Sequence, residues 1–152
     1  MKEIIESLYR LTKSYELLIE KTDQVFNALK IKDYDTKAIL EFETEELYKE
    51  KEKNEHYLIH MVKAKAEQLG LEDKRIEAIL DIHDNEIENM KVQYGLEKML
   101  EKMKSFQLNL RRNIEFAAVF IETKGKEIEI MFEVIRRESI EQGGPLLINE
   151  EL

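Results

Sequence analysis

The stretch LEKMLEKMKSFQLNLRRNIEFAAVFIETKGKEIEIMFEVI, residues Leu96–Ile135, decides the fold. Steps of four and three residues, taken in turn from Leu96, meet apolar side chains at ten of twelve positions. Because this spacing averages about 3.5 residues, these side chains stay on one side of an α-helix. The twelve positions are Leu96, Leu100, Met103, Gln107, Leu110, Ile114, Ala117, Ile121, Lys124, Ile128, Met131 and Ile135. The pattern predicts one long amphipathic helix.

The apolar stripe widens in the middle of this helix. The six residues from Phe116 to Ile121 are all apolar and leave almost no polar side. A helix that is apolar all round needs neighbours on more than one face. We therefore expect a second packing partner for this part of the chain.

Composition limits the fold and the function. The chain has 152 residues, 38% of them charged, with five glycines, one proline and no cysteine. Because glycine and proline, the residues that favour turns, are so few, the composition predicts long helices. The lack of cysteine excludes disulfides and zinc thiolate sites. A net charge of −9 argues against nucleic acid as a partner. No apolar run reaches a membrane span and the amino terminus has no signal-peptide layout, so we expect a soluble cytoplasmic protein.

The rest of the chain predicts an all-α fold, an antiparallel bundle of three long helices plus one short crossing helix, with the last helix longest. We expect helices at about 2–30, 36–69, 72–82 and 86–139, in a single domain of residues 1–140 with a flexible tail at 141–152. In the first helix the buried positions should be Ile4, Leu8, Leu11, Tyr15, Leu18, Thr22, Val25 and Leu29. Asp33, Asp35 or Thr36 should cap the second helix, and Asn85 with Glu88 should start the last.

Three features of this plan need explanation. The second helix is apolar at both ends, whereas residues 49–56 read KEKEKNEH. We interpret this as the exposed middle of a helix that packs near its ends; the alternative is a short binding surface for a charged partner.

Gly70 suits the left-handed residue that closes a helix. The last helix exceeds the others in length, so part of it should overhang or fold back, and Gly95 and Gly125 are the places where a bend costs least.

Motifs for chemistry are scarce. His56 and His60 have the i, i+4 spacing that lets two imidazoles share a metal, but no third ligand is fixed near them. The sequence holds no glycine-rich phosphate loop and no nucleophile elbow. We predict no enzyme activity, no metal and no cofactor; a helical metalloprotein using the two histidines is a third hypothesis.

The methionines and phenylalanines of the last helix give a different indication. They supply the adaptable apolar surface used by proteins that hold another chain's helix. From Leu96 to Leu110 we expect this surface to be core. From Phe116 to Ile135 the stripe doubles, and we expect a surface for a partner or for self-association.

The layout resembles the FlgN-like flagellar type III export chaperones. The similar details are ETEEL at residues 43–47, QLGL at 68–71 and LNLRRNI at 108–114, with Asn113 matching an asparagine that the family has before its last helix. The chain lacks the family's tyrosine-glycine near the carboxyl end, since its last tyrosine is Tyr94. The resemblance covers roughly residues 1–140.

The resemblance implies a cytoplasmic chaperone for type III secretion. Its cargo would be the amphipathic C-terminal helices of hook-filament junction proteins, kept unassembled before export, with the flagellar export gate as a further partner. The partner-binding residues would be Asn113, Ile114, Phe116, Ala117, Phe120, Ile121, Ile128, Met131, Phe132 and Ile135, with charged residues at their rim. The alternative is a structural homo-oligomeric coiled-coil module without chaperone activity.

Overall fold

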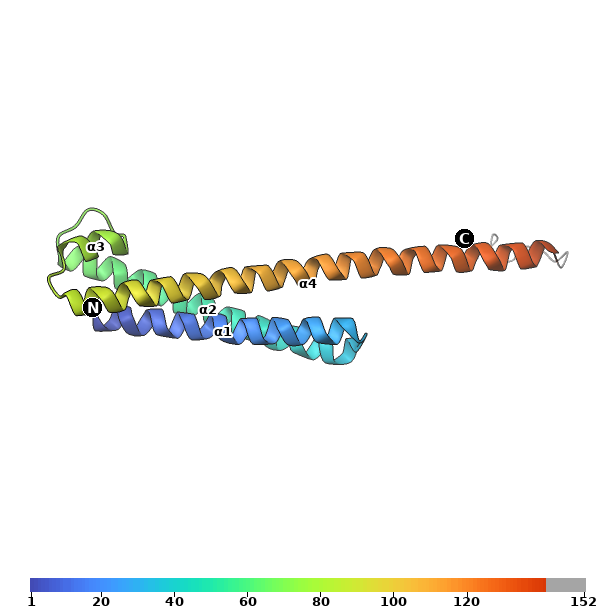
Figure 1. The fold of residues 1–152 in the computed structure, drawn as a ribbon, viewed down its shortest axis with the longest axis horizontal. Coiled ribbons are helices and arrows are strands. Elements are labelled where there is room, and N and C mark those ends of the chain that lie inside the picture. The colour runs from blue at the N-terminus through green and yellow to red at the C-terminus, as the bar shows by residue number, and fades with distance from the viewer. Residues whose placement is uncertain (142–152) are drawn as a thin grey trace. The chain divides into compact units, whose positions relative to one another are not determined.

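The computed structural model describes residues 1–141, with side chains described through residue 137. This part of the chain is all-α, an antiparallel bundle of three long helices with a short fourth (Figure 1). The helices are α1 (Lys2–Lys30), α2 (Tyr34–Gln68), α3 (Ile76–Ile82) and α4 (Glu86–Glu141), of which α4 is the longest. The predicted fold class and element order are confirmed. Residues 142–152, nearly all of the predicted tail, lie outside the described residues.

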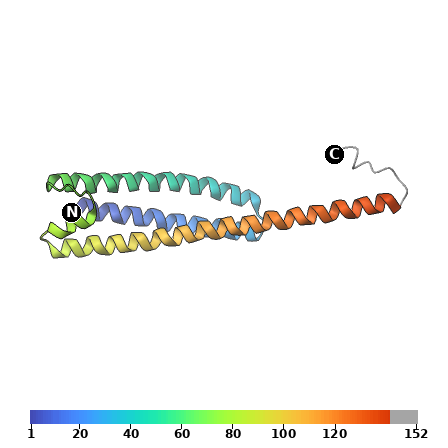
Figure 2. The ribbon, with the colours of Figure 1, turned by 90° about the horizontal axis from the view of Figure 1, so that it is seen from above.

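The chain divides into two units, Met1–Asn113 and the residues from Ile114 onward. In the first unit α1, α2 and the first part of α4 pack on one another. Figure 2 views them with α1 between the other two, and the Tyr48 ring of α2 also lies 6.4 Å from the Phe106 ring of α4. All eight positions predicted to be buried in α1 are buried. The four-three spacing therefore identifies the core side of this helix correctly.

Tight hydrogen-bonded turns end the first two helices. After α1, the Lys32 and Asp33 amides donate to the carbonyls of Leu29 and Ala28, and Lys32 has a φ of 60°. Asp33 then caps α2, because its carboxylate accepts from the Thr36 amide at 3.2 Å and from the Thr36 hydroxyl at 2.6 Å. These bonds lower the pKa of Asp33. Asp33 is one of the three caps that the sequence offered.

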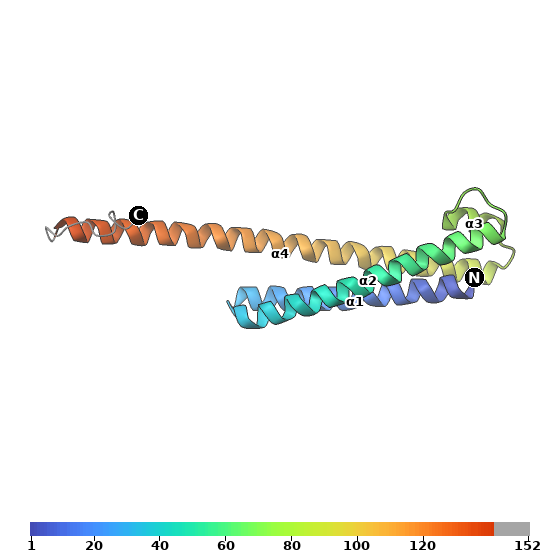
Figure 3. The ribbon, with the colours of Figure 1, turned by 180° about the vertical axis from the view of Figure 1, so that it is seen from behind.

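The closing turn of α2 is the one predicted at Gly70. Gly70 has a φ of 70°, and the amides of Gly70 and Leu71 donate to the carbonyls of Glu67 and Ala66. This pattern satisfies two carbonyls that the helix end would leave without partners. The chain then reaches α3, which begins at Ile76 instead of the predicted Glu72 and lies near the end of α2 (Figure 3).

The predicted packing of α2 at both ends is confirmed only in part for its first end, where Leu40 and Leu47 are half-buried and Leu47 packs against the core. Ile39 and Phe42 are exposed there, whereas Lys51 in the charged middle is buried at 7% exposure. The Lys51 ammonium lies 4.3 Å from the centre of the Tyr48 ring and 3.2 Å from a Glu55 carboxylate oxygen. A long aliphatic stem lets a lysine pack against neighbours, so a charged sequence does not require an exposed helix face.

A hydrogen bond joins the middle of α2 to α1. Asn54 donates through its amide to the Ser14 hydroxyl at 2.7 Å, and Ser14 is buried. Beyond it α2 buries Leu58, Val62 and Ala66. The helix therefore packs through its middle and its second end, and at Leu47 nearer its first end.

The predicted core positions of α4 between Leu96 and Leu110 are confirmed at Leu96, Met103 and Leu110 and wrong at Leu100 and Gln107. Leu100 is 42% exposed and Gln107 is exposed, whereas Val92 and Phe106 are buried. The core side follows Val92, Leu96, Met99, Met103, Phe106 and Leu110. These positions keep the four-three spacing but step by three after Leu96, which puts the polar Gln107 in solvent.

The two glycines of α4 do not interrupt the helix, which runs unbroken through Gly95 and Gly125. A Cβ added at Gly95 would lie 3.3 Å from the Leu8 Cβ, so this glycine allows α1 and α4 to approach closely. Asn85 starts α4 as predicted, because its side-chain oxygen accepts from the Glu88 amide at 3.1 Å. Across residues 1–141, none of the helices combines the length and the apolar composition that a membrane span requires.

Candidate partner-binding surface

A polar network joins α4 to α1 at the end of the first unit. The Asn109 side-chain amide lies 3.2 Å from the Ile19 carbonyl, 3.1 Å from the Thr22 hydroxyl and 3.1 Å from an Asp23 carboxylate oxygen. Thr22 is itself buried and donates back to the Leu18 carbonyl at 2.8 Å. A buried polar group requires partners in set positions, so this network fixes which side of α4 faces α1.

Arg112 extends the network by one helical turn. Its guanidinium donates to Asp23 at 3.0 Å and lies 4.0 Å from the centre of the Phe26 ring. A guanidinium stacked on an aromatic ring while it binds a carboxylate is held in both position and orientation. We call Thr22, Asp23, Asn109, Arg112 and Asn113 the α1–α4 polar network.

Asn113, one of the predicted partner-binding residues, belongs to this network. Its amide donates to the Thr22 carbonyl at 2.9 Å, and its oxygen accepts from Arg112. The structure therefore gives Asn113 a role in helix packing. Its contact with a partner stays a prediction.

The second unit presents a long apolar surface on α4. We name the exposed apolar residues here the 114–135 surface, and their exposed fractions range from 40% to 70%. They are Ile114, Val119, Ile121, Ile128, Ile130, Met131, Phe132, Val134 and Ile135. Exposed apolar side chains are common singly, whereas so many on one helix segment indicate an interaction site.

Three more of the predicted partner-binding residues, Phe116, Ala117 and Phe120, are half-buried. The Lys124 ammonium lies 5.9 Å from the centre of the Phe120 ring and 3.0 Å from a Glu127 oxygen. Lys124 occupies a position of the predicted apolar stripe, so a charge sits within the surface and is paired with an acid one turn away.

The apolar residues of the 114–135 surface extend widely around the helix. At 100° per residue they cover an arc of roughly 200°, whereas one neighbouring helix needs a stripe of about 100°. Charged residues fill the rest, and they pair along the helix itself, as Lys126 does with Glu122 at 3.3 Å and Arg137 with Glu133 at 3.7 Å. The arc is wide enough to contact two helices of a partner on different faces of α4.

The two histidines considered as metal ligands are both exposed on α2. Within residues 1–141, no group of three or more His, Asp or Glu side chains is arranged to hold a metal ion. The structure thus places no third ligand beside His56 and His60 in the described part of the chain.

Comparison with family models, curated proteins and solved structures found no match to this chain.

The sequence prediction left out some apolar residues of this surface. Val119 belongs to the predicted widening of the stripe, and Ile130 and Val134 belong to its predicted second row. None of the three was among the predicted binding residues, although Val119 is 62% and Ile130 is 63% exposed. The polar network was also missed, because asparagine and arginine on a charged helix look like surface residues until their partners are known.

Proposed function

We propose that this protein is a FlgN-like type III export chaperone of the cytoplasm. It binds the amphipathic C-terminal helices of hook-filament junction proteins and keeps them unassembled before secretion. The observation that carries the proposal is the 114–135 surface, whose apolar side chains are 40–70% exposed. Holding a helix requires exposed apolar area of this kind, and it requires no catalytic group.

The width of the apolar arc supports a cargo with more than one helix. A cargo with two helices would place one along Ile114, Ile121 and Ile128 and the second along Val119, Ile130 and Val134, on nearly the opposite face of α4. Each row repeats at helical spacing, so each matches the apolar stripe of one amphipathic helix.

Charges at the rim would choose among cargoes. Glu115 and Glu122 lie toward the start of the surface, whereas Arg136 and Arg137 lie at its end. A cargo helix with basic residues beside the first pair and acidic residues beside the second would bind in one direction. Rim charges of this kind contribute more to specificity and association rate than to affinity.

The experiment compares two exposed isoleucines. Ile121 on the surface and Ile39 on α2 are 70% and 61% exposed. We expect Ile121→Glu to weaken binding of a hook-filament junction C-terminal segment more than tenfold, since it buries a charge against the cargo. Ile39→Glu is the matched control and should leave binding unchanged. Binding is measured by calorimetry, and helix content by circular dichroism.

A homo-oligomeric coiled-coil module is the second candidate, because the same wide apolar arc would also suit a second copy of the chain. Light scattering separates the two functions. A monomer or weak dimer that gains thermal stability with cargo supports the chaperone. A tight dimer whose stability is unaffected by cargo supports the structural module and contradicts our proposal.

A further inference from the structure

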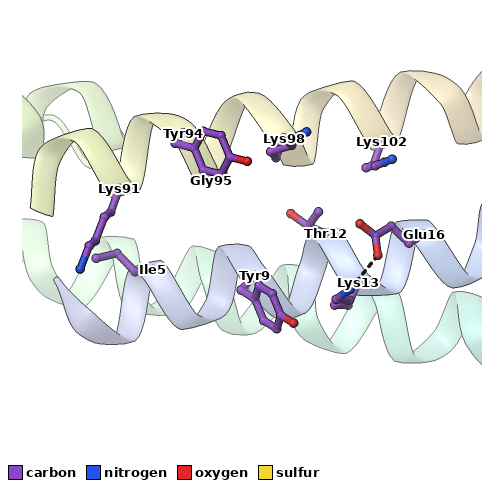
Figure 4. Close-up of a pocket in the computed structure, with 10 residues that line it drawn as sticks. All are labelled: Ile5, Tyr9, Thr12, Lys13, Glu16, Lys91, Tyr94, Gly95, Lys98 and Lys102. Carbon is purple, nitrogen blue, oxygen red and sulfur yellow. Dashed lines mark hydrogen bonds and ion pairs between the residues drawn. The ribbon is translucent and has the colours of Figure 1, made fainter.

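A groove of about 370 Å³ runs between α1 and α4 within the first unit (Figure 4). Ile5 and the bare backbone of Gly95 contribute to its lining. Because Gly95 has no side chain and lies against Leu8, the two helices come close here without filling the space above them. The groove is therefore a feature of the helix pairing itself.

Two tyrosines give the groove its apolar character. Tyr9 on α1 and Tyr94 on α4 both line it, and both are 64% exposed. Tyrosines offer large, rigid contact area at a low cost in side-chain entropy, and they are enriched at protein interfaces. Their rings are available to pack against a ligand.

Lysines give the groove its charge. Lys13, Lys91, Lys98 and Lys102 line it together with a single acid, Glu16. The Lys13 ammonium pairs with Glu16 at 3.0 Å, and Lys98 comes within only 4.0 Å of Glu101. A chain with a net charge of −9 thus has a local excess of positive charge at this place.

Two of these lysines, Lys91 and Lys102, form no ion pair among the described residues. Lys98 and Lys102 are also four residues apart on one helix, a like-charge spacing that destabilises the helix. Positive charges held together at a cost to the helix suit an acidic ligand that would neutralise them.

We propose that this groove binds an acidic amphipathic helix of a partner protein. The apolar side of that helix would pack on Ile5, Tyr9 and Tyr94, and its carboxylates would reach the lysines of α4. Lys91 and Lys102 are eleven residues apart on α4, about 16 Å at 1.5 Å per residue, so the groove accommodates about three helical turns. No residue of the groove belongs to the 114–135 surface.

Charge complementarity favours an acidic protein segment over a nucleic acid. A nucleic acid needs a basic stripe along its whole backbone, and it would meet the acidic remainder of this chain beyond the groove. An amphipathic peptide needs only a short basic stretch beside an apolar floor. The two tyrosines would contribute to binding of the peptide through its apolar side.

The probe is a labelled peptide of about 14 residues, with leucines at i, i+3, i+4 and i+7 positions and glutamates elsewhere. Fluorescence anisotropy measures its binding to the full chain. We expect Lys91→Glu combined with Lys102→Glu to raise Kd at least about tenfold. The matched control combines Lys53→Glu with Lys104→Glu, which makes the same change in net charge at exposed lysines outside the groove, and should change Kd less than about twofold.

Two further variants identify the site and the ligand class. Tyr94→Ala should weaken binding about fivefold through lost apolar contact, and Phe120→Glu should leave it unchanged. Equal weakening by the two lysine pairs would overturn the proposal, as would binding of polyglutamate or single-stranded DNA as tightly as the peptide. Loss of peptide binding in Phe120→Glu would also overturn it, because the peptide would then occupy the 114–135 surface. Cargo binding is measured separately, so failure here leaves the chaperone proposal standing.

Discussion

Replacing Asn109 by alanine tests whether the α1–α4 polar network holds α4 in register. The Asn109 amide has two N–H groups and three acceptors within 3.2 Å, so it makes two of these bonds at a time. Two bonds contribute about 2 kcal/mol in total, since the partly exposed Asp23 adds less than a buried carboxylate would. Alanine is the better helix former by about 0.6 kcal/mol. We expect Asn109→Ala to lower the free energy of unfolding by about 1.5 kcal/mol.

Urea unfolding followed by circular dichroism measures this loss. Gln107→Ala on the exposed side of the same helix is the matched control, and it should be neutral or slightly stabilising. A change of less than about 0.5 kcal/mol for Asn109→Ala would refute the reasoning. A double-mutant cycle with Asp23→Ala then isolates the pair, and a coupling energy near zero would show that the contact does not stabilise the bundle.

Three other substitutions test local details. Ser7 is 1% exposed and, within the described residues, its hydroxyl lacks a hydrogen-bond partner. Ser7→Ala should therefore raise the free energy of unfolding by about 1 kcal/mol. A loss of stability would contradict this. Lys32 has a φ of 60°, so Lys32→Gly should stabilise by about 0.5 kcal/mol. Lys30→Gly should destabilise, because Lys30 is the last residue of α1 and its ammonium lies 4.8 Å from the centre of the Phe26 ring. Hydrogen bonds from Arg75 lower the pKa of Asp73 to about 2. Because this pKa is depressed, its contribution to stability is present above about pH 4 and is lost between about pH 4 and pH 2. A carbon-13 titration should show the pKa of Asp73 returning toward its ordinary value in Arg75→Gln; an unchanged titration would contradict the assigned cause.

Much of the fold could be predicted from the sequence because local signals agree with one another. The bounds of α1, the Asp33 and Asn85 caps and the turn at Gly70 all follow from residue types whose backbone preferences are strong. The core side of α1 followed from its four-three spacing. These features depend on near neighbours in the chain.

Features that depend on distant residues were harder to predict. Leu100 and Met99 are both apolar, and only the packing of α4 on α1 shows that Met99 faces the core. Lys51 looked like a surface lysine because the residues around it in the sequence are charged. Nothing in the sequence indicates that its side chain packs beside the Tyr48 ring. The same holds for Asn109, whose partners lie 86 to 90 residues earlier in the chain.

The candidate site shows the same division. A helical pattern predicted Ile114, Ile121, Ile128 and Met131, and all four are exposed. Asn113 entered the prediction through the family resemblance, and the structure gives it a hydrogen bond to α1. The groove beside Tyr9 and Tyr94 was not predicted, because its residues come from two helices whose pairing the sequence does not state.

The most direct test of the central claim is the affinity of the full chain and of Ile121→Glu for a hook-filament junction C-terminal segment. The account predicts that the unaltered protein binds the segment, that Ile121→Glu binds it more than about tenfold more weakly with unchanged helix content, and that Ile39→Glu behaves like the unaltered protein. Equal binding by all three proteins would contradict the assignment of the 114–135 surface. No binding by the unaltered protein would contradict the chaperone function.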